Sequence, residues 1–362
     1  MRLRTTALLL LLFLAWGCAP GAVPSEPAPA ATETPLPAAP PPDPEIRLAF
    51  VGDILLGGEL DGIIQYRGVD YPWVHAAPIL RQADLAIGNL ETAVSRRGTP
   101  SPDKQFTFRS RPETLAGAAR AGMDVLSLAN NHALDYGRDA LLDTIANVRA
   151  AGMHPVGAGK DLAEAFSPAL FEVRGLKVAV LGFTRVIPFA TWVAGQKQPG
   201  LAAGWEPEPV LAAVTDASTR ADVVVVLFHW GEEVKDIPRA SDMELARQLI
   251  DAGATVIVGH HPHVLQGIDL RGSGLIAYSL GNFIFTSVSR PLNQETGILA
   301  VTVTRGGVKS ARFHPMYISQ GQPRPADAKT ARRIQERLDR LSVRWQTRVA
   351  DDFTISALDG PD

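Results

Sequence analysis

Short apolar runs that each end in a polar cluster recur along this chain, and they constrain its fold more than any other feature. The runs cover residues 46–51, 84–88, 124–128, 222–228 and 254–258, and segments of helical character lie between most of them. Strands that alternate with helices predict a parallel sheet of the α/β class. In such sheets ligands bind beyond the carboxyl ends of the strands. The sequence therefore predicts one site, built from the polar clusters that follow the runs.

Further segments complete the α/β pattern. Helices are expected over residues 72–81, 112–121, 138–151 and 241–252, and strands over residues 104–109 and 176–182. After residue 263 the pattern changes. Residues 275–278, 297–304 and 308–317 predict a β-rich closure, and residues 328–344 predict an amphipathic helix. The arginines on that helix are typical of a solvated face, so we assign it no partner.

The N-terminus has the organisation of a targeting segment. Arg2 and Arg4 precede an apolar run over residues 7–16, which is shorter than the ~20 residues of a membrane-spanning helix. The single cysteine, Cys18, follows at once, where a bacterial lipoprotein signal carries its lipidated residue. The alternative is an ordinary secretory signal in which Cys18 is incidental. Both interpretations predict an exported protein of the cell envelope.

A proline-rich stretch separates this segment from the folded part. Residues 19–44 contain ten prolines and seven alanines, and neither lysine nor arginine, which is typical of a stiff, extended tether. The predicted organisation is a signal peptide over residues 1–18, a linker over 19–44, a folded domain over 45–322, and a C-terminal helix and tail over 323–362.

The composition limits both the partners and the chemistry. The chain has 35 lysines and arginines against 38 aspartates and glutamates, and a net charge of −3 gives no basis for nucleic-acid binding. One cysteine excludes a thiolate metal cluster within the chain. A metal would then be held by histidine, aspartate, glutamate or asparagine, and such donors suit Mn, Fe, Zn or Co.

The polar clusters supply donors of that kind. His260, His261 and His263 fall within four residues, which serves core packing poorly and favours a metal site. The other candidates are Asp53, Asn89, Glu91, Asn131, His132 and His229. Each of these, taken alone, has a plain structural alternative as a turn, capping or core residue.

Six motifs in a fixed order carry a resemblance to a known family. They are Val51-Gly52-Asp53-Ile54, Asn89-Leu90-Glu91-Thr92, Ala129-Asn130-Asn131-His132-Ala133-Leu134-Asp135-Tyr136-Gly137, His229-Trp230-Gly231-Glu232, Gly259-His260-His261-Pro262-His263-Val264 and Tyr278-Ser279-Leu280-Gly281-Asn282-Phe283. Over roughly residues 45–320 the chain resembles the calcineurin-like metallophosphoesterases and, among them, the CapA or PGA-cap family of bacterial capsule synthesis proteins. The resemblance implies a four-layer α/β/β/α sandwich. It also implies a role in the synthesis, anchoring or export of capsule or poly-γ-glutamate.

The resemblance implies roles for individual residues as well. One or two divalent ions (Mn, Fe or Zn) would be held by Asp53, Glu91, Asn131, His229, His261 and His263. His132 would be the general acid that protonates the leaving oxygen. The residues that would support these or replace one of them are Asn89, His260, Asp135, Glu232 and Asn282, of which Asp135, Glu232 and Asn282 are equally typical of turns and caps.

Two positions depart from the superfamily pattern. Where the superfamily has Asp-x-His, Asp53 is followed by Ile54 and Leu55, so a histidine is missing. Asn89 replaces the bridging aspartate, and a neutral amide cannot neutralise two cations. Either Glu91 takes over the bridge, or one metal position is weak or empty.

Two classes of function follow from these observations. The first is an exported, membrane-anchored, metal-dependent hydrolase of a phosphoester or related bond, and the amide bond of polyglutamate is open to the same metal chemistry. The second is a non-catalytic protein that binds or anchors an anionic surface polymer. Both predict an anionic polymer or phosphoester as ligand, a lipid anchor in the membrane, and membrane proteins of a capsule system as partners.

Overall fold

Two β-sheets pack face to face in the computed structural model, which describes residues 12, 14–18, 21, 43–286 and 290–358. The first sheet has ten strands in the order β19-β20-β17-β16-β1-β2-β5-β6, with β15 beside β1 and β18 beside β17. Their bounds are β1 Ile46–Ile54, β2 Leu85–Leu90, β5 Val125–Ser127, β6 His154–Val156, β15 Asn282–Ile284, β16 Glu295–Thr304, β17 Gly307–Ser319, β18 Gln322–Pro325, β19 Thr347–Val349 and β20 Thr354–Ala357. The strands β1, β2, β5 and β6 are parallel, and β16 is antiparallel to β1.

The second sheet has six strands in the order β13-β14-β12-β11-β9-β8. Their bounds are β8 Ala169–Val173, β9 Leu176–Thr184, β11 Val223–His229, β12 Val256–His260, β13 Ile268–Arg271 and β14 Gly274–Ala277. The four central strands are parallel, and the edge strands β8 and β13 are antiparallel to their neighbours. Two short pairs lie outside both sheets: β3 Ala93–Val94 with β4 Arg109–Ser110, and β7 Ala158–Gly159 with β10 Gly200–Leu201.

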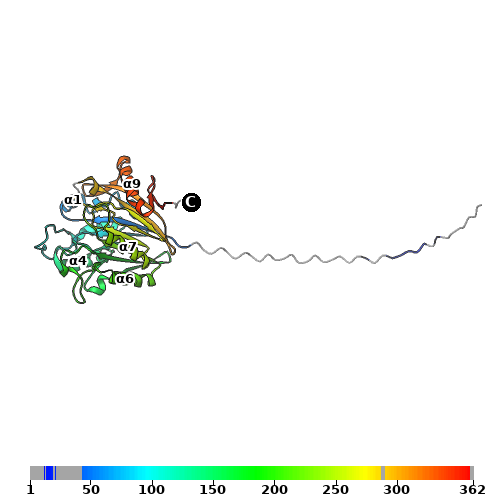
Figure 1. Cartoon of the computed structure of the whole chain (residues 1–362), viewed down its shortest axis with the longest axis horizontal. Coiled ribbons are helices and arrows are strands. Elements are labelled where there is room, and N and C mark those ends of the chain that lie inside the picture. Colours follow the sequence, from blue (N-terminus) through cyan, green and yellow to red (C-terminus); the bar gives the residue numbers. More distant parts are fainter. Residues whose placement is uncertain (1–11, 13, 19–20, 22–42, 287–289, 359–362) are drawn as a thin grey trace, which may run out of the picture. The chain divides into compact units, whose positions relative to one another are not determined.

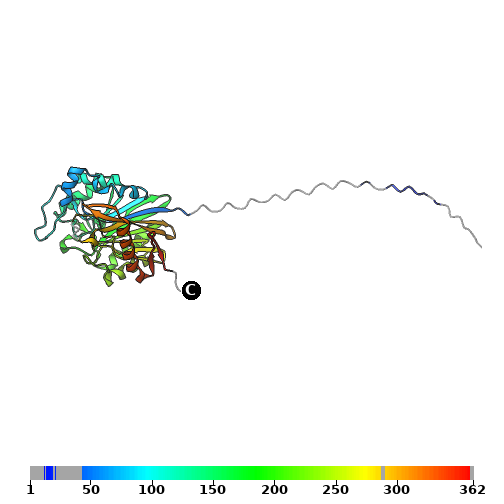
Figure 2. The same cartoon turned by 90° about the horizontal axis from the view of Figure 1, so that it is seen from above.

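Helices cover the outer faces of both sheets. The α-helices are α1 Glu59–Arg67, α2 Ala77–Leu80, α3 Leu115–Ala121, α4 Gly137–Ala150, α5 Leu162–Ala165, α6 Pro207–Arg220, α7 Ala240–Asp251, α8 Pro291–Gln294 and α9 Ala328–Ser342. The 3₁₀ helices are η1 Tyr71–Trp73, η2 Pro112–Thr114, η3 Ala190–Trp192 and η4 Val343–Trp345. Helices α6 and α7 lie side by side at the bottom of Figure 1, away from α9 at the top. Seen from above, the blue and cyan segments with α1 and α3 lie on the opposite side of the strands from the green segments (Figure 2).

Alternate residues of each central strand face different cores, as the period of two in a strand requires. Along β1, Leu48 and Phe50 pack in one core with Val180 of the second sheet, whereas Val51 packs with the helices α1 to α4. Along β9, Val180 faces the first sheet and Leu181 packs with α6 and α7. The layers therefore run helix, sheet, sheet, helix, which confirms the predicted four-layer α/β/β/α sandwich.

The prediction of one continuous helix over residues 72–81 is wrong. The structure has η1 (Tyr71–Trp73) and α2 (Ala77–Leu80), and each has a proline in its first turn. Pro78 has no N–H to donate to the preceding turn, and its ring would clash with the carbonyl group four residues earlier. A helix that enters from Pro72 therefore ends, and a new one begins at residue 77.

The prediction of a strand over residues 104–109 is wrong for its first five residues, since only β4 (Arg109–Ser110) is a strand. The N–H of Phe108 donates to Asp135 Oδ2 at 2.6 Å, and Lys104 also bonds to the Asp135 carboxylate. The Asp135 carboxylate thus accepts the hydrogen bond that the backbone of a neighbouring strand would accept in a sheet.

The remaining predicted strands and helices form within a few residues of their expected bounds, and α6, β19 and β20 are elements that the sequence pattern did not indicate. One compact unit spans residues 43–362. The C-terminal segment is part of it, because α9 buries Ile334 and Leu338 in the core between the sheets.

The predicted signal peptide and linker fall mostly on residues outside those that the structure describes. Cys18 is described and is exposed. Within the described residues, we find no helix that has both the length and the apolar character of a membrane span.

Replacement of Phe50 by alanine tests the core between the sheets. Phe50 is fully buried there, so we expect Phe50→Ala to lower the free energy of unfolding by about 3–5 kcal/mol, measured by urea unfolding. Phe106→Ala is the matched control, because Phe106 is 61% exposed; its expected effect is within about 0.5 kcal/mol. Equal unfolding midpoints for the two variants would contradict this account of the core.

Candidate functional site

The carboxyl ends of the central strands of both sheets meet at one edge of the molecule, and polar side chains gather there. Asp53 lies near the end of β1, Asn89 in β2, and His229 at the end of β11. Asn89 Nδ2 lies 2.9 Å from Asp53 Oδ1 in its own sheet and 3.4 Å from His229 Nδ1 in the other. The two sheets thus bring residues that are far apart in sequence into one buried cluster.

A bulge in β1 directs Asp53 toward this cluster. The pairing of β1 with β2 shifts register between Phe50 and Asp53, which bends the strand and re-aims its side chains. The shift depends on Gly52, since a Cβ atom there would lie 2.0 Å from the carbonyl oxygen of Gly281. The same oxygen accepts a hydrogen bond from the N–H of Asp53 at 2.9 Å. A side chain at position 52 would therefore displace the carboxylate.

Two sets of candidate ligand atoms share Glu91. One set comprises Glu91, His261 and His263, and the other comprises Asp53, Glu91 and His229; within each set the ligand atoms lie within 4.8 Å of one another. Glu91 Oε1 lies 3.8 Å from Nε2 of His229 and 3.8 Å from Nε2 of His263. Among the described residues, neither Glu91 Oε1 nor His261 Nδ1 has a hydrogen-bond partner, although both atoms are buried. Burying a polar atom without a partner is costly, and a bound divalent cation would satisfy both atoms. The residues present therefore fit a metal ion.

Asn89 supports the cluster through its amide nitrogen. Its orientation is fixed by Asn130, whose Oδ1 accepts from the backbone N–H of His132 at 3.0 Å and whose Nδ2 donates to a backbone carbonyl of β2 at 2.8 Å. Asn130 Nδ2 also donates to Asn89 Oδ1 at 3.0 Å. Asn89 Nδ2 is then left facing the carboxylates of Asp53 and Glu91. Asn89 donates to the candidate ligands, and its own oxygen is already engaged.

The three histidines at the end of β12 and in the loop after it differ in their contacts. His261 and His263 have φ angles of 95° and 58°, and such angles in residues other than glycine cluster at functional sites. His263 Nδ1 lies 2.9 Å from Asn282 Oδ1, which holds the ring in place. His260 Nε2 donates instead to the carbonyl oxygen of Val51 at 3.2 Å, and His260 belongs to neither ligand set.

Asn131 and Glu232 are two further residues that the sequence predicts for the site, and only Asn131 lies close to the cluster. Asn131 Oδ1 lies 2.9 Å from Nε2 of His229, so Asn131 adjoins the set that contains Asp53. Glu232 is exposed and belongs to neither set; the charge that acts on His263 from this loop is that of Glu233.

His132 lies beside the ligand sets and forms a buried group with Asp135 and Lys104. His132 Nδ1 lies 2.7 Å from Asp135 Oδ2 and 2.9 Å from Lys104 Nζ, and Lys104 also pairs with Asp135 Oδ1. The ring of Phe108 packs on that of His132 with 4.5 Å between their centroids. A carboxylate at Nδ1 fixes the orientation of an imidazole ring. The arrangement leaves Nε2 of His132 to exchange a proton with a ligand.

Lys104, Phe108 and Asn130 were assigned no role from the sequence. A single lysine in a polar stretch looks like a solvated lysine, so no sequence signal pointed to Lys104. Asn130 lies in the motif over residues 129–137, and its position next to Asn131 is the one sequence feature that indicates a role for it.

Burial and charge give the two carboxyl groups of the cluster different proton affinities. Burial acts to raise the pKa of Asp53, but the hydrogen bond from His263 and the charges of His260 and His263 outweigh it and hold that pKa below its usual value. Burial and the neighbouring charge of Asp53 raise the pKa of Glu91 well above its usual value. Without a cation, Glu91 therefore retains a proton more readily than Asp53.

The histidines are also unequal. Burial, with the charge of His263, lowers the pKa of His261 to about 3, and burial lowers the pKa of His229 well below its usual value. Burial also acts to lower the pKa of His263, but the charges of Glu91 and Asp53 and a hydrogen bond to Asp53 raise it to about 9. Two imidazoles are thus neutral and able to ligate, whereas His263 carries a proton that an incoming cation would displace.

Comparisons with known proteins agree with the order of the motifs. Residues 47–287 match the family model described as bacterial capsule synthesis protein PGA_cap. The chain is 35% identical over 288 residues to the capsule biosynthesis protein CapA of Bacillus anthracis, covering 78% of this chain and 69% of that protein. It is 32% identical over 285 residues to the PGA biosynthesis protein CapA of Bacillus subtilis (strain 168), covering 78% of this chain and 74% of that protein.

Solved structures resemble the chain more distantly. A hypothetical protein from Thermus thermophilus aligns over 77% of this chain and 96% of its own, with 20% identity and a TM-score of 0.43. The 5'-nucleotidase from Candida albicans SC5314 aligns over 71% of this chain and 48% of its own, with 13% identity and a TM-score of 0.39. At TM-scores this low the fold assignment rests on the strand order and the core clusters of the chain itself.

The raised pKa of His263 predicts how metal affinity depends on pH. Below a pKa of about 9 the fraction of neutral His263 falls tenfold with each pH unit, so we expect the affinity for Mn²⁺ to rise at least about tenfold per unit from pH 6 to pH 8. Calorimetric titration in buffers of different ionisation enthalpy would measure both the affinity and the protons released.

Two variants control this measurement. His263→Asn should lose most of the affinity and the proton release. His154→Asn should keep both, because His154 is an exposed residue of β6. An affinity that does not change with pH would contradict the assignment of His263 as a ligand.

Proposed function

The chain belongs to the PGA_cap family of bacterial capsule synthesis proteins, and we propose that it is an exported, membrane-anchored hydrolase that requires a divalent metal and cleaves a phosphoester or related bond. The relatives are named for the biosynthesis of capsule and PGA. We place this chain in the same process, with membrane proteins of a capsule system as partners and an anionic polymer or a phosphoester as ligand.

The shared position of Glu91 carries the proposal. Glu91 belongs to both ligand sets, and its buried Oε1 has no hydrogen-bond partner among the described residues. A carboxylate in this position could serve two cations. Asp53, His229, His261 and His263 provide the remaining oxygen and nitrogen donors, a set that suits Mn, Fe or Zn. When bound there, such ions would polarise the bond to be cleaved and lower the pKa of a bound water.

His132 acts as the general acid in this proposal. Asp135 accepts from its Nδ1 and orients the ring, so that Nε2 can deliver a proton to the leaving oxygen. Lys104 binds Asp135 and the carbonyl oxygen of Asn131, and it thereby fixes the loop that carries the acid. Burial lowers the pKa of His132, against the effect of Asp135, so the ring is a stronger acid than free imidazole.

Two features favour the second candidate, a non-catalytic protein that binds or anchors an anionic polymer. Leu55 stands where the superfamily has a histidine ligand. Asn89, in place of a bridging aspartate, presents its amide nitrogen to the carboxylates. Both changes remove a metal donor. The amide bond of polyglutamate is a third target, open to the same metal chemistry.

The proposed location rests on the N-terminal segment. Cys18 is exposed, and a lipid on it would anchor the chain in the membrane. The proline-rich linker over residues 19–44 would then hold the folded unit at a distance from the membrane surface.

Metal content is the first test of the proposal. We expect the purified full-length protein to hold two equivalents of Mn, Fe or Zn, measured by elemental analysis, and Glu91→Gln to lose most of both because Glu91 belongs to both ligand sets. One equivalent would mean that Leu55 and Asn89 have removed a position. Folded protein that takes up no metal after reloading would contradict the hydrolase and favour polymer binding.

The role of His132 is tested separately from metal binding. We expect His132→Asn to lower kcat for a phosphodiester by about 10²–10⁴-fold while leaving metal content unchanged, because His132 belongs to neither ligand set. His154→Asn is the control with unchanged kcat. A rate equal to that of the wild type in His132→Asn would contradict the assignment of the acid.

A further inference from the structure

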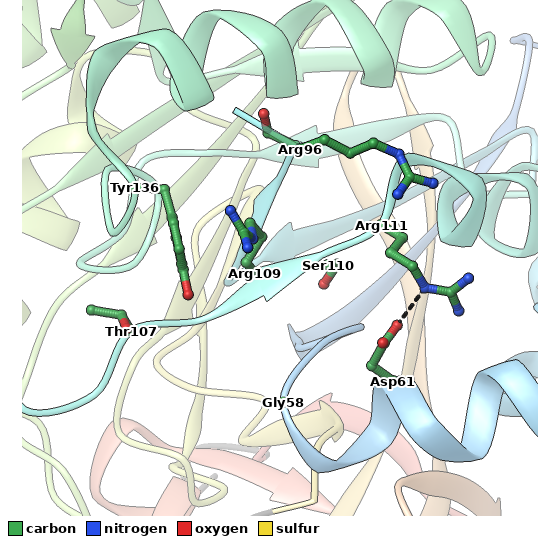
Figure 3. A pocket seen from close by; sticks show the side chains of 9 residues that line it. Gly58, Asp61, Arg96, Thr107, Arg109, Ser110, Arg111 and Tyr136 are labelled. Atoms are coloured by element: carbon green, nitrogen blue, oxygen red, sulfur yellow. Dashed lines mark hydrogen bonds and ion pairs between the residues drawn. The ribbon is translucent and has the colours of Figure 1, made fainter. Parts of the chain in front are cut away.

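A cavity lies outside both ligand sets, next to segments that follow strands of the first sheet. It has a volume of about 530 Å³ and is lined by β4, by the residues on either side of β4, and by segments that follow β1, β3 and β5. Figure 3 shows three arginines around it, Arg96, Arg109 and Arg111, with Tyr136 opposite Arg111. Most of its polar lining is therefore cationic or neutral, and Asp61 is the only carboxylate among the described residues that line it.

The three guanidinium groups differ in how far they are neutralised. Arg111 Nε lies 2.8 Å from Asp61 Oδ1 (Figure 3), and Arg96 pairs at 2.7 Å with Glu113 at the exposed surface. Within the part of the chain that the structure describes, no carboxylate pairs with Arg109. Its guanidinium lies over the ring of Tyr136, 4.3 Å from the centroid. The uncompensated positive charge of the cavity is therefore that of Arg109.

Arg109 is positioned by the strands that carry the metal ligands. A Cβ atom at Gly57, just after β1, would lie 2.2 Å from the carbonyl oxygen of Arg109, so only glycine allows this approach. On the next residue, Ser110 Oγ lies 3.1 Å from Oγ1 of Thr92, which directly follows Glu91. The cavity and the candidate metal centre are thus parts of one packed structure.

The cavity is connected to the His132 group through two pairs of residues that are neighbours in the sequence. Arg109 follows Phe108, whose ring packs on His132. Tyr136 follows Asp135, which bonds to His132 Nδ1. The two segments that hold His132 thus also shape the cavity, although Phe108, His132 and Asp135 do not line it.

We propose that this cavity binds an anionic group, a carboxylate or a phosphate, of a chain-like substrate, with Arg109 as the principal contact. A guanidinium binds either oxyanion through two parallel N–H bonds. The ring of Tyr136 contacts the flat face of the Arg109 guanidinium and holds it in place. The N–H donors at the edge of the guanidinium are therefore left for a ligand. The inference rests on the proposed function, since an anionic polymer is a ligand proposed there. In a polymer with a negative charge on each unit, one unit would occupy the cavity while another part of the polymer lies at the metal centre.

Binding of two defined oligomers tests this proposal. The full-length protein is titrated calorimetrically, at low salt and with saturating Mn²⁺, with an oligomer of ten γ-linked glutamates and with a glycerol phosphate oligomer of the same length. We expect Arg109→Gln to weaken binding of one or both oligomers about tenfold or more. Arg109→Lys keeps the positive charge but lacks the two parallel N–H donors, so we expect its affinity to lie between those of the wild type and Arg109→Gln. Arg344→Gln is the matched control, because Arg344 also stacks on an aromatic ring, that of Trp345, but lies outside the cavity. Its expected change is less than twofold.

The outcomes separate the cavity from the hydrolase. Loss confined to the glutamate oligomer identifies a carboxylate as the anion, and loss confined to the glycerol phosphate oligomer identifies a phosphate. Wild-type protein that binds neither oligomer, or a folded Arg109→Gln protein that binds both as the wild type does, would overturn the proposal. Hydrolysis of a small phosphodiester by the wild type is measured in parallel. Its absence, together with binding that depends on Arg109, would contradict the proposed function and leave the anion site supported.

Discussion

The apolar contact between the two sheets determines where every functional side chain lies. Leu48 and Phe50 of the first sheet and Val180 of the second belong to one core, and the parallel strands around them end at one edge. Asn89 and His229 can approach to 3.4 Å only because the sheets are packed in this relative position. The centre is thus built on rigid strand ends, and its loops have only short distances to span.

At that edge the chain must compensate buried charge. Asp53 and Glu91 are both fully buried beside imidazole groups, and two bare carboxylates in such a place are unfavourable without a cation or bound protons. The substitution of an amide at Asn89 removes a third negative charge and supplies a donor to the other two. Asn89 thus lowers the charge that a cation would have to balance, and Glu91 is the residue that both candidate ligand sets share.

The alternation of strands and helices predicted an α/β sheet and most of the candidate donors after its strands, because both follow from local rules. The four layers were implied only by the resemblance to a known family. A run such as residues 222–228 predicts a buried strand, and a residue directly after it, such as His229, is then a candidate for the sheet edge. The details that depend on the path of a loop were not accessible. The positive φ angles of His261 and His263 turn those rings inward while His260 bonds to Val51. Lys104 reaches Asp135 only because the segment before β4 leaves the strand conformation.

The position of β1 in its sheet sets the order in which the protein can assemble. Ile46, at the beginning of β1, pairs with Val303 in β16, and the edge of that sheet is closed only by β19 and β20 near the C-terminus. At ~5–20 residues per second of synthesis, the partner of β1 emerges on the order of ten seconds or more after β1 itself. Until then one side of β1 has no neighbour, and an unpaired strand edge invites pairing with other chains. The strand that comes first in the sequence is therefore among the last to be completed, wherever the chain folds, because its second neighbour lies about 250 residues further along the chain.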